Sequence, residues 1–474
     1  MNFVIYDIVL LTAFVIFVSI FLYRRKKNLK REGFLILYKT SAGIKAINKI
    51  GEKYKKLLNV LSYVSIALGF LLMAGMLYLF GRIVWIYVFN PEIVSLVKVP
   101  PIMPLLPYLP QVFQLNFLPP FYFIYWIIII AVVAISHEFS HGIFAANKKV
   151  KIKSTGFGFF PFFLPIFLAA FVELDEKKMQ KKKISHQMAI LSAGTFANTL
   201  VAILFFAVLL LFFWIAFTPS GVIFDTYTYS VVGISAITSV NNVHVSNISY
   251  NQLLSLANTS ALADVKTNDS EYFITENFLT QQKNNQGYIY LYDNAPAIKA
   301  NLPNTIVRIN GINVNNEEQL GKILMNYSPG SNITITALNG NSYQDYKITL
   351  GQNPQNKSAP YLGIGFMSRG STGIFNKIMS WFSFKDSNVY YKSNFEAAEF
   401  IYNLLWWLVV ISFSVALVNM LPVGIFDGGR FFYLTILAIT KSKQKAEKAF
   451  KFMTGLFLFL LLVLMVFWAV GLFK

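Results

Sequence analysis

Cysteine is absent from this chain of 474 residues, and acidic side chains are scarce. The lack of cysteine excludes disulfide bonds, thiolate nucleophiles and zinc–thiolate sites. Charged residues make up only 13% of the sequence, whereas hydrophobic residues make up 55%. This balance excludes an ordinary soluble domain and is typical of a polytopic membrane protein.

The charges that are present are mostly positive, and the formal net charge is +19. Lysine and arginine concentrate in three stretches, residues 24–56, 148–183 and 430–451, and each stretch borders an apolar segment. Short basic loops beside membrane spans mark the cytoplasmic face and bind anionic lipid headgroups. We therefore expect membrane lipids, and no nucleic acid, as the partners of these loops.

Six apolar segments are long enough to cross a hydrocarbon core of about 30 Å. They cover approximately residues 4–22, 59–89, 120–146, 187–217, 398–422 and 452–472. The first segment lacks a basic start and is followed by the basic run from Arg24 to Lys27, so it is predicted to be an uncleaved anchor. Alternation of the spans then places all three basic loops in the cytoplasm and both termini outside.

The segment between the fourth and fifth spans, residues 221–395, has a different character. Its charges nearly balance, and short β-branched stretches alternate with turn residues. An internal repeat relates residues 237–247 to residues 306–316. Each copy has a short strand, an Asn-Asn or Asn-Gly turn and a second short strand, followed by a helical stretch that contains Gln-Leu.

The second copy of the repeat, over about residues 285–350, resembles a PDZ domain. This resemblance implies binding of peptide C-termini or extended segments by strand addition at a sheet edge. The first copy is a further unit or part of one interrupted PDZ domain, and a spacer that only packs over the spans is the alternative. The predicted fold class is an α-helical polytopic membrane protein of about six transmembrane helices with an inserted extracytoplasmic PDZ-like α+β domain.

The third apolar segment contains the sequence His137-Glu138-Phe139-Ser140-His141. Two histidines four residues apart share one face of a helix and can bind one zinc ion, while the glutamate can take a proton from water on that ion. Ionisable residues at membrane depth are costly and are usually functional. The pattern predicts a hydrolytic zinc site inside the bilayer; the alternative is a chance motif whose His–Glu pair only packs.

A tetrahedral catalytic zinc ion needs a third protein ligand, which in a chain without cysteine must be His, Asp or Glu. Asp427 is the best candidate, because it ends a run from Asn419 at the inner end of the fifth span. Pro422 and Gly424 in this run can break the helix and let Asp427 turn inward, which lipid tolerates where backbone faces protein. Both motifs lie at similar depth, so we expect the zinc site nearer the cytoplasmic face.

HExxH in one span and NxxPxxxxDG in a later span, on either side of a PDZ-like insert, resemble the site-2 protease family of intramembrane zinc metalloproteases. The fixed positions of both motifs are matched by His137, Glu138, His141, Asn419, Pro422, Asp427 and Gly428. The resemblance covers about residues 120–217 and 398–435 and the PDZ-like insert. The first two spans and residues 221–285 lie outside it.

The resemblance also implies roles for individual residues. His137, His141 and Asp427 would hold one zinc ion per chain, and Glu138 would be the catalytic acid and base. The resemblance thus implies Zn²⁺ as the cofactor.

A further family motif, AGPxxN, falls in the fourth span. It reads Ala193 to Asn198 here, with Thr195 in place of the proline. Asn198 or Asn419 is expected to contact substrate and stabilise the oxyanion of the reaction, or alternatively to bond to broken backbone.

These assignments divide the chain into four parts. Residues 1–119 form N-terminal transmembrane anchor helices with a basic cytoplasmic loop, and residues 120–220 form the first half of a metalloprotease core. Residues 221–395 form the extracytoplasmic PDZ-like part, and residues 396–474 form the second half of the core with the last transmembrane helix. The expected location is the cell membrane, with both termini and the insert extracytoplasmic.

The predicted function is zinc-dependent intramembrane cleavage of transmembrane segments of single-pass membrane proteins, as in regulated intramembrane proteolysis. The resemblance implies substrates already trimmed by another protease, with the insert as a filter. Residues 156–165, apolar but broken by Gly and Pro, are interpreted as a re-entrant hairpin that holds unwound substrate, or equally as an interfacial loop. The alternative function is a non-catalytic membrane-anchored PDZ-type peptide-binding protein.

The orientation can be tested by cysteine labelling, because the natural chain has no cysteine. Single cysteines at Lys53, Lys182 and Lys443 are expected to resist an impermeant reagent in intact cells, since charge bias places them in the cytoplasm. A cysteine at Asn332 is expected to be labelled. Labelling at position 182 in intact cells would overturn the orientation.

Overall fold

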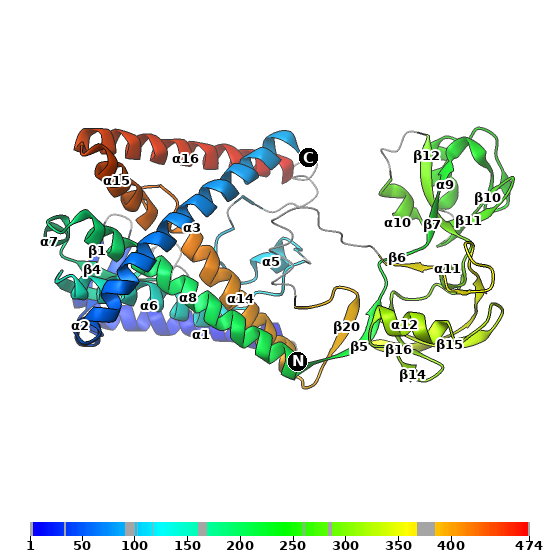
Figure 1. Cartoon of the computed structure of the whole chain (residues 1–474), viewed down its shortest axis with the longest axis horizontal. Coiled ribbons are helices and arrows are strands. Elements are labelled where there is room, and N and C mark those ends of the chain that lie inside the picture. The colour runs from blue at the N-terminus through cyan, green and yellow to red at the C-terminus, as the bar shows by residue number, and fades with distance from the viewer. Residues whose placement is uncertain are drawn as a thin grey trace. The chain divides into compact units, whose positions relative to one another are not determined.

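The computed structural model describes residues 3–32, 35–90, 100–101, 103–115, 117–159, 168–258, 261–282, 287–366 and 384–472. The chain divides into two compact units (Figure 1). One unit combines Met1–Phe212 with Glu399–Lys474, and the other comprises Phe213–Ala398.

Six helices of the first unit are long and apolar enough to cross a membrane. They are α1 (Phe3–Arg24), α3 (Lys55–Phe89), α6 (Phe123–Asn147), α8 (Ile184–Ala216), α14 (Ala398–Val418) and α16 (Lys443–Leu472). The prediction of six spans is therefore confirmed. It could be made from the sequence because the hydropathy of some twenty consecutive residues is a local property of the chain. Two limits were wrong: α14 ends four residues earlier than predicted, before Pro422, and α16 begins with a basic turn at Lys443.

Shorter elements connect the spans. Four helices, α2 (Ile44–Lys53), α5 (Leu109–Val112), α7 (Glu176–Gln180) and α15 (Asp427–Thr440), accompany the 3₁₀ turn η1 (Lys26–Asn28). An antiparallel sheet has the order β1-β2-β3-β4, with strands β1 (Leu29–Glu32), β2 (Leu35–Thr40), β3 (Ile152–Phe159) and β4 (Leu168–Leu174). The predicted re-entrant segment 156–165 lies in β3 up to residue 159, and its residues 160–165 lie outside the described residues.

A buried apolar cluster joins the elements that carry the candidate metal ligands. It includes Leu72 of α3, Phe144 of α6, Ile190 of α8, Phe431 of α15, and Met420 between α14 and α15. Each of these side chains is at most 4% exposed. The relative positions of α6, α8 and α15 are therefore set by close packing, which tolerates little displacement.

The first span is attached to the N-terminus of α6 by a buried carboxylate. Asp7 of α1 is 2% exposed, and its oxygens accept hydrogen bonds from the backbone N–H groups of Phe123 (2.7 Å) and Ile124 (3.0 Å). The Tyr108 hydroxyl donates a further hydrogen bond to the same carboxylate. The first N–H groups of a helix have no partner within the helix, and a carboxylate there also complements the helix dipole.

The second unit contains two six-stranded antiparallel sheets. One has the order β7-β12-β11-β10-β8-β9, with strands β7 (Tyr229–Gly233), β8 (Ile237–Val240), β9 (Val243–His244), β10 (Ala263–Thr267), β11 (Glu271–Ile274) and β12 (Tyr288–Asp293). The other has the order β16-β15-β13-β5-β20, with β14 paired to β13. Its strands are β5 (Phe217–Ile223), β13 (Thr305–Ile309), β14 (Ile312–Asn313), β15 (Asn332–Asn339), β16 (Ser342–Thr349) and β20 (Val389–Ser393).

Helices and short strand pairs complete this unit. The helices are α9 (Tyr250–Ala257), α10 (Glu276–Thr280), α11 (Pro296–Lys299), α12 (Glu317–Leu324) and the 3₁₀ turn η3 (Ile234–Ala236). The pairs are β6 (Thr226–Tyr227) with β19 (Ile364–Gly365) and β17 (Gly351–Gln352) with β18 (Pro360–Tyr361). Each large sheet has its own buried apolar cluster, so the insert contains two hydrophobic cores.

The internal repeat corresponds to equivalent turns in the two sheets. Asn241 joins β8 to β9, and Asn310 joins β13 to β14. Both asparagines have positive φ, 49° and 47°, and the side-chain oxygen of each accepts a backbone N–H from a neighbouring strand, Asp264 (3.0 Å) or Thr334 (2.7 Å). Asparagine suits this turn because it tolerates the left-handed region and supplies an acceptor. The two copies therefore occupy separate sheets.

Replacement of Asp7 by alanine is expected to destabilise the first unit. It leaves the N–H groups of Phe123 and Ile124 buried without an acceptor, at a cost of about 1–3 kcal/mol for each unpaired group. Thermal unfolding of the purified protein measures the effect. Asp7→Asn keeps an oxygen acceptor and should cost less, and Thr12→Ala, at an exposed site on α1, serves as the control. An unchanged unfolding temperature for Asp7→Ala would contradict the proposed tie between α1 and α6.

Candidate metal centre

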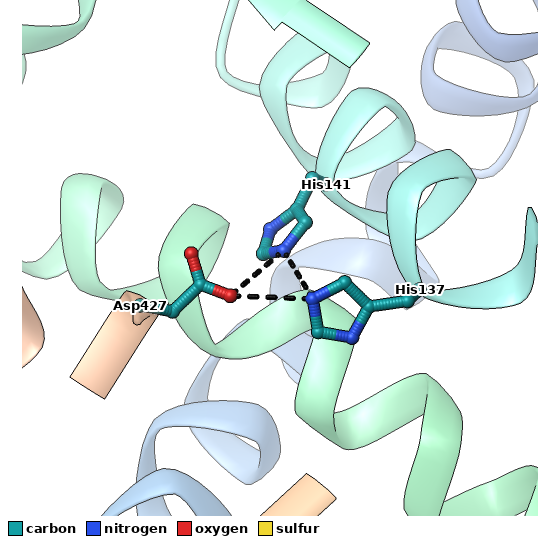
Figure 2. Close-up of side chains that lie close together, drawn as sticks. All are labelled: His137, His141 and Asp427. Atoms are coloured by element: carbon teal, nitrogen blue, oxygen red, sulfur yellow. Dashed lines mark hydrogen bonds and ion pairs between the residues drawn. The ribbon is translucent and has the colours of Figure 1, made fainter. Parts of the chain in front are cut away.

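The two histidines of the HExxH sequence lie one turn apart on α6. Their side chains are 9% and 10% exposed, and their Nε2 atoms are 3.1 Å apart. Two ring nitrogens at this distance point to a common position, as Figure 2 shows. The helical spacing predicted from the sequence thus brings both imidazoles to one face of α6.

Asp427 completes the group from the first position of α15. Its Oδ2 atom lies 3.2 Å from His137 Nε2 and 3.2 Å from His141 Nε2 (Figure 2). The chain between α14 and α15 is not helical, as Pro422 and Gly424 predict, and it is closed by a 2.7 Å hydrogen bond from Gly428 N–H to the Asn419 carbonyl.

Gly428 explains why glycine follows the aspartate. A Cβ atom at this position would lie 2.3 Å from the backbone carbonyl carbon of Met420. Only glycine therefore lets α15 begin directly against the preceding loop, and this close approach carries Asp427 to the two histidines.

The three converging atoms have the spacing of a tetrahedral zinc site. Ligand atoms at about 2.0–2.1 Å from one tetrahedral ion lie about 3.3 Å from each other. The observed separations between the two Nε2 atoms and Oδ2 are 3.1, 3.2 and 3.2 Å. Two imidazoles and one carboxylate are also a ligand set found at catalytic zinc sites. The residues present therefore fit zinc.

One face of α8 packs against the two imidazoles. Residues 190, 194 and 198 are spaced by four and so lie on the same side of the helix. The Ile190 carbonyl is 2.6 Å from His141 Nδ1, and the Asn198 amide is 3.1 Å from His137 Nδ1. Hydrogen bonds from the outer ring nitrogen commonly orient histidines that bind metals.

Gly194 lies between these two contacts. A Cβ atom there would be 2.5 Å from His141 Nε2 and 2.6 Å from His137 Nε2. Any side chain at this position would therefore occupy the space where the ligand atoms converge. The glycine of the AG-x-x-x-N sequence keeps the metal position open.

Glu138 is held beside the histidines by the sheet. The backbone N–H of Val172 in β4 donates a 3.0 Å hydrogen bond to Glu138 Oε2. A cavity of about 330 Å³ is lined by both residues of the His137-Glu138 pair, by Asp427 and by Asn419. The rest of its wall is formed by Ala169 and Ala170 of β4, by apolar side chains of α6 and α14, and by Leu105, Ile425 and Phe426.

The two asparagines that were predicted from the sequence to contact substrate or the oxyanion lie in different environments. Asn419 lines the cavity beside Glu138. Asn198 is completely buried and contacts His137 Nδ1 and the Ser136 hydroxyl (3.2 Å). Sequence reasoning missed the contacts of the Ile190 carbonyl, Gly194 and Val172, although the spacing of four between Gly194 and Asn198 was a signal.

The fold and the site define a class of protein: a helical membrane protein in which a candidate span and the start of a second helix, α15, bring together three metal-ligating side chains. The sequence model of peptidase family M50 matches residues 125–464, so the chain belongs to this family. Family M50 is the site-2 protease family of membrane zinc metallopeptidases. The expected cofactor and enzyme class are thus confirmed at the level of the family.

A curated relative was also found. An uncharacterised protein of Methanocaldococcus jannaschii is 31% identical over 202 residues, which cover 41% of this chain and 48% of the relative. The chain therefore spans about half the length of that relative.

Loss of a ligand or of the space for the ion is expected to remove zinc from the purified protein. Asp427→Ala deletes one ligand atom, and Gly194→Ala places a methyl group where the ligand atoms converge. Both variants should bind far less than one zinc ion per chain by elemental analysis. The matched controls are His244→Ala, in the second unit, and Gly75→Ala, where a Cβ would make only an ordinary 3.6 Å contact. Full zinc content in Asp427→Ala would mean that the third ligand lies elsewhere.

Measurement of zinc binding also distinguishes the roles of Asn198 and Asn419. Asn198→Ala should weaken zinc binding by about 10–100-fold, because outer hydrogen bonds to metal-binding histidines have effects of this size. Asn419→Ala should leave zinc affinity unchanged. Equal effects of the two substitutions would contradict a role of Asn198 in orienting His137.

Proposed function

We propose that this protein is a zinc-dependent intramembrane endopeptidase that cleaves transmembrane segments of single-pass membrane proteins. One observation carries the proposal: three metal-ligating atoms converge beside Glu138 in a cavity lined by α6, a candidate span. A hydrolytic site in this position acts on a peptide bond that has entered the membrane.

His137, His141 and Asp427 are proposed to hold the zinc ion, which supplies a Lewis acid and lowers the pKa of water bound to it. Glu138 is proposed to act as general base and then as general acid. Its carboxylate takes a proton from the attacking water and passes that proton to the leaving amine. The N–H of Val172 holds one carboxylate oxygen in place, 3.0 Å away, and so supports this assignment.

Asn198 is proposed to position His137 rather than to contact substrate. A histidine that binds a metal through Nε2 carries its proton on Nδ1, which needs an acceptor. In the structure Asn198 Nδ2 faces His137 Nδ1 and Oδ1 faces the Ser136 hydroxyl (3.2 Å). Rotation of the amide by 180°, which exchanges its nitrogen and oxygen, lets the side-chain oxygen accept the His137 proton while Nδ2 donates to Ser136 Oγ, whose hydroxyl donates to the Val133 carbonyl (3.1 Å). Asn419 lines the cavity and remains our candidate for stabilising the oxyanion.

The substrate is proposed to lie as an extended strand along β4. A helix conceals its carbonyls in its own hydrogen bonds, so a transmembrane segment must unwind before cleavage. β4 is at one end of the sheet order, and its small residues Ala169 and Ala170 line the cavity that contains Glu138. Addition of a strand to a sheet edge satisfies the backbone groups of an unwound segment.

The insert is proposed to select substrates from the extracytoplasmic side. Two sheets with separate cores and several edge strands support peptide recognition by a PDZ-like part at residues 221–395. The substrates proposed are membrane proteins already trimmed by another protease, so that large ectodomains are excluded. The charge bias of the loops supports a zinc site nearer the cytoplasmic face.

A cleavage assay with two substrates tests these proposals together. The substrates are a short transmembrane peptide and the same peptide carrying a large folded ectodomain. The wild type should cleave only the short peptide. Glu138→Gln should lose cleavage by several orders of magnitude while zinc remains bound, because it removes the proton carrier and no ligand. Deletion of residues 221–395, with a flexible linker, should retain zinc and cleave both substrates.

Each outcome of this assay addresses a different proposal. Cleavage by Glu138→Gln at the wild-type rate would contradict the role of Glu138 as general base and general acid. No cleavage by wild-type protein that carries zinc would favour the non-catalytic peptide-binding alternative. Unchanged substrate selection by the deleted protein, tested with several linker lengths, would contradict the filter.

A further inference from the structure

A second cavity, distinct from the metal centre, lies among the ends of three candidate spans. Its volume is about 580 Å³, and it is lined by the start of α3, the end of α6 and the start of α8. Six lysines line it: Lys55, Lys148, Lys149, Lys181, Lys182 and Lys183. Among the described residues, no acidic side chain lines it and none of the six lysines forms an ion pair.

The positive charge of this cavity is not compensated by an ion pair within the part of the chain that the structure describes. Lys148 Nζ donates to the Asn59 amide oxygen at 2.8 Å, a neutral partner. Burial lowers the pKa of Lys148, because partial desolvation disfavours its charged ammonium form. An anion in the cavity would supply that charge.

The backbone around the cavity is held in place before any ligand binds. Gln187, which is 6% exposed, donates hydrogen bonds from Nε2 to the carbonyls of Gln180 (3.3 Å) and Lys182 (2.9 Å). These bonds hold the loop that presents three of the lysines. Ser185 and His186 of the first turn of α8 also line the cavity, so the positive end of that helix dipole lies at the same place.

Two local features at the end of α6 cost free energy as long as no ligand occupies the cavity. Lys149 has φ of 58°, in the left-handed region where glycine is normally found after a helix. Asn147, 7% exposed, lines the cavity, and its Oδ1 accepts no hydrogen bond from the described residues. A ligand that carries a phosphate and also a hydroxyl or ammonium donor would match both the lysines and this oxygen.

We propose that this cavity binds the headgroup of an anionic phospholipid, with the lysines on the phosphate and Asn147 on a headgroup donor. The lipid is favoured over a soluble phosphate because the cavity is formed where three candidate spans end, which is the level of lipid headgroups. Basic pockets between transmembrane helices are known to bind such headgroups. The proposal does not depend on the proposed protease activity.

Occupancy of the cavity has a structural consequence. The headgroup would join α6, which carries both histidines, to α8, which carries Ile190, Gly194 and Asn198. A bound lipid should therefore raise the thermal stability of the protein. Both lipid binding and stability are measured without any substrate, so their outcome is independent of cleavage.

The test uses full-length protein in phosphatidylcholine nanodiscs, titrated with phosphatidylglycerol and analysed by native mass spectrometry. Wild-type protein should retain one phosphatidylglycerol and unfold at a higher temperature with it. Lys181→Gln, Lys182→Gln and Lys183→Gln combined should weaken this binding by about tenfold to a hundredfold. The control combines Lys443→Gln, Lys445→Gln and Lys448→Gln, which remove the same charge from exposed positions of α16. Equal losses in the two triple variants would overturn the site.

Replacement of Lys149 by glycine tests lipid binding and protein stability separately, because the two are expected to respond differently. Lys149→Gly should weaken phosphatidylglycerol binding by about fivefold. In the same variant, glycine at positive φ should leave the unfolding temperature of lipid-free protein unchanged or raise it. Unweakened binding in this variant would count against the proposal. Glycerol phosphate, tested as a soluble competitor, should not displace the lipid at similar concentration; displacement would replace the lipid assignment by a soluble phosphate ligand.

Discussion

The structure depends on one constraint: three polar metal-ligating side chains must meet among apolar helices. His137 and His141 lie within 3.1 Å of each other, and Asp427 approaches both at 3.2 Å from a different helix. This convergence is possible because two glycines remove side chains where backbone or ligand atoms come closest. Gly194 leaves room for the ion, and Gly428 lets α15 begin against its own preceding loop.

Other buried polar groups of the first unit serve to hold α6. Asp7 satisfies the N–H groups at its start, the Ile190 carbonyl and Asn198 contact its two imidazoles, and the N–H of Val172 holds Glu138. Together these contacts join α6 to three other elements, α1, α8 and β4. In an apolar environment an unpaired polar group is costly, so these bonds are both structural restraints and a means of fixing the geometry of the site. The first span, outside the family resemblance, is thereby connected to the metal centre.

Much of this arrangement could be predicted from local sequence. The six spans follow from hydropathy, and HExxH follows from the 3.6-residue period of a helix, which places residues four apart on one face. Asp427 was identified from a helix-breaking run and from matching depth. The end of the fifth span was wrong because a hydropathy window does not register where Pro422 and the Asn419 turn end the helix. The carbonyl of Ile190 could not be predicted, since a backbone acceptor has no residue signature.

The sequence by itself determined the membrane class, the set of metal-ligating residues, the family motifs and the two-copy pattern of the insert. These properties reside in composition, in periodicity and in residues close together along the chain. Only the tertiary structure decided that Asn198 lies behind His137 while Asn419 lines the cavity, and that Asp7 caps α6. It also decided that lysines from three separate segments share one cavity. These relations join groups from segments that are far apart along the chain, and helix packing sets their proximity.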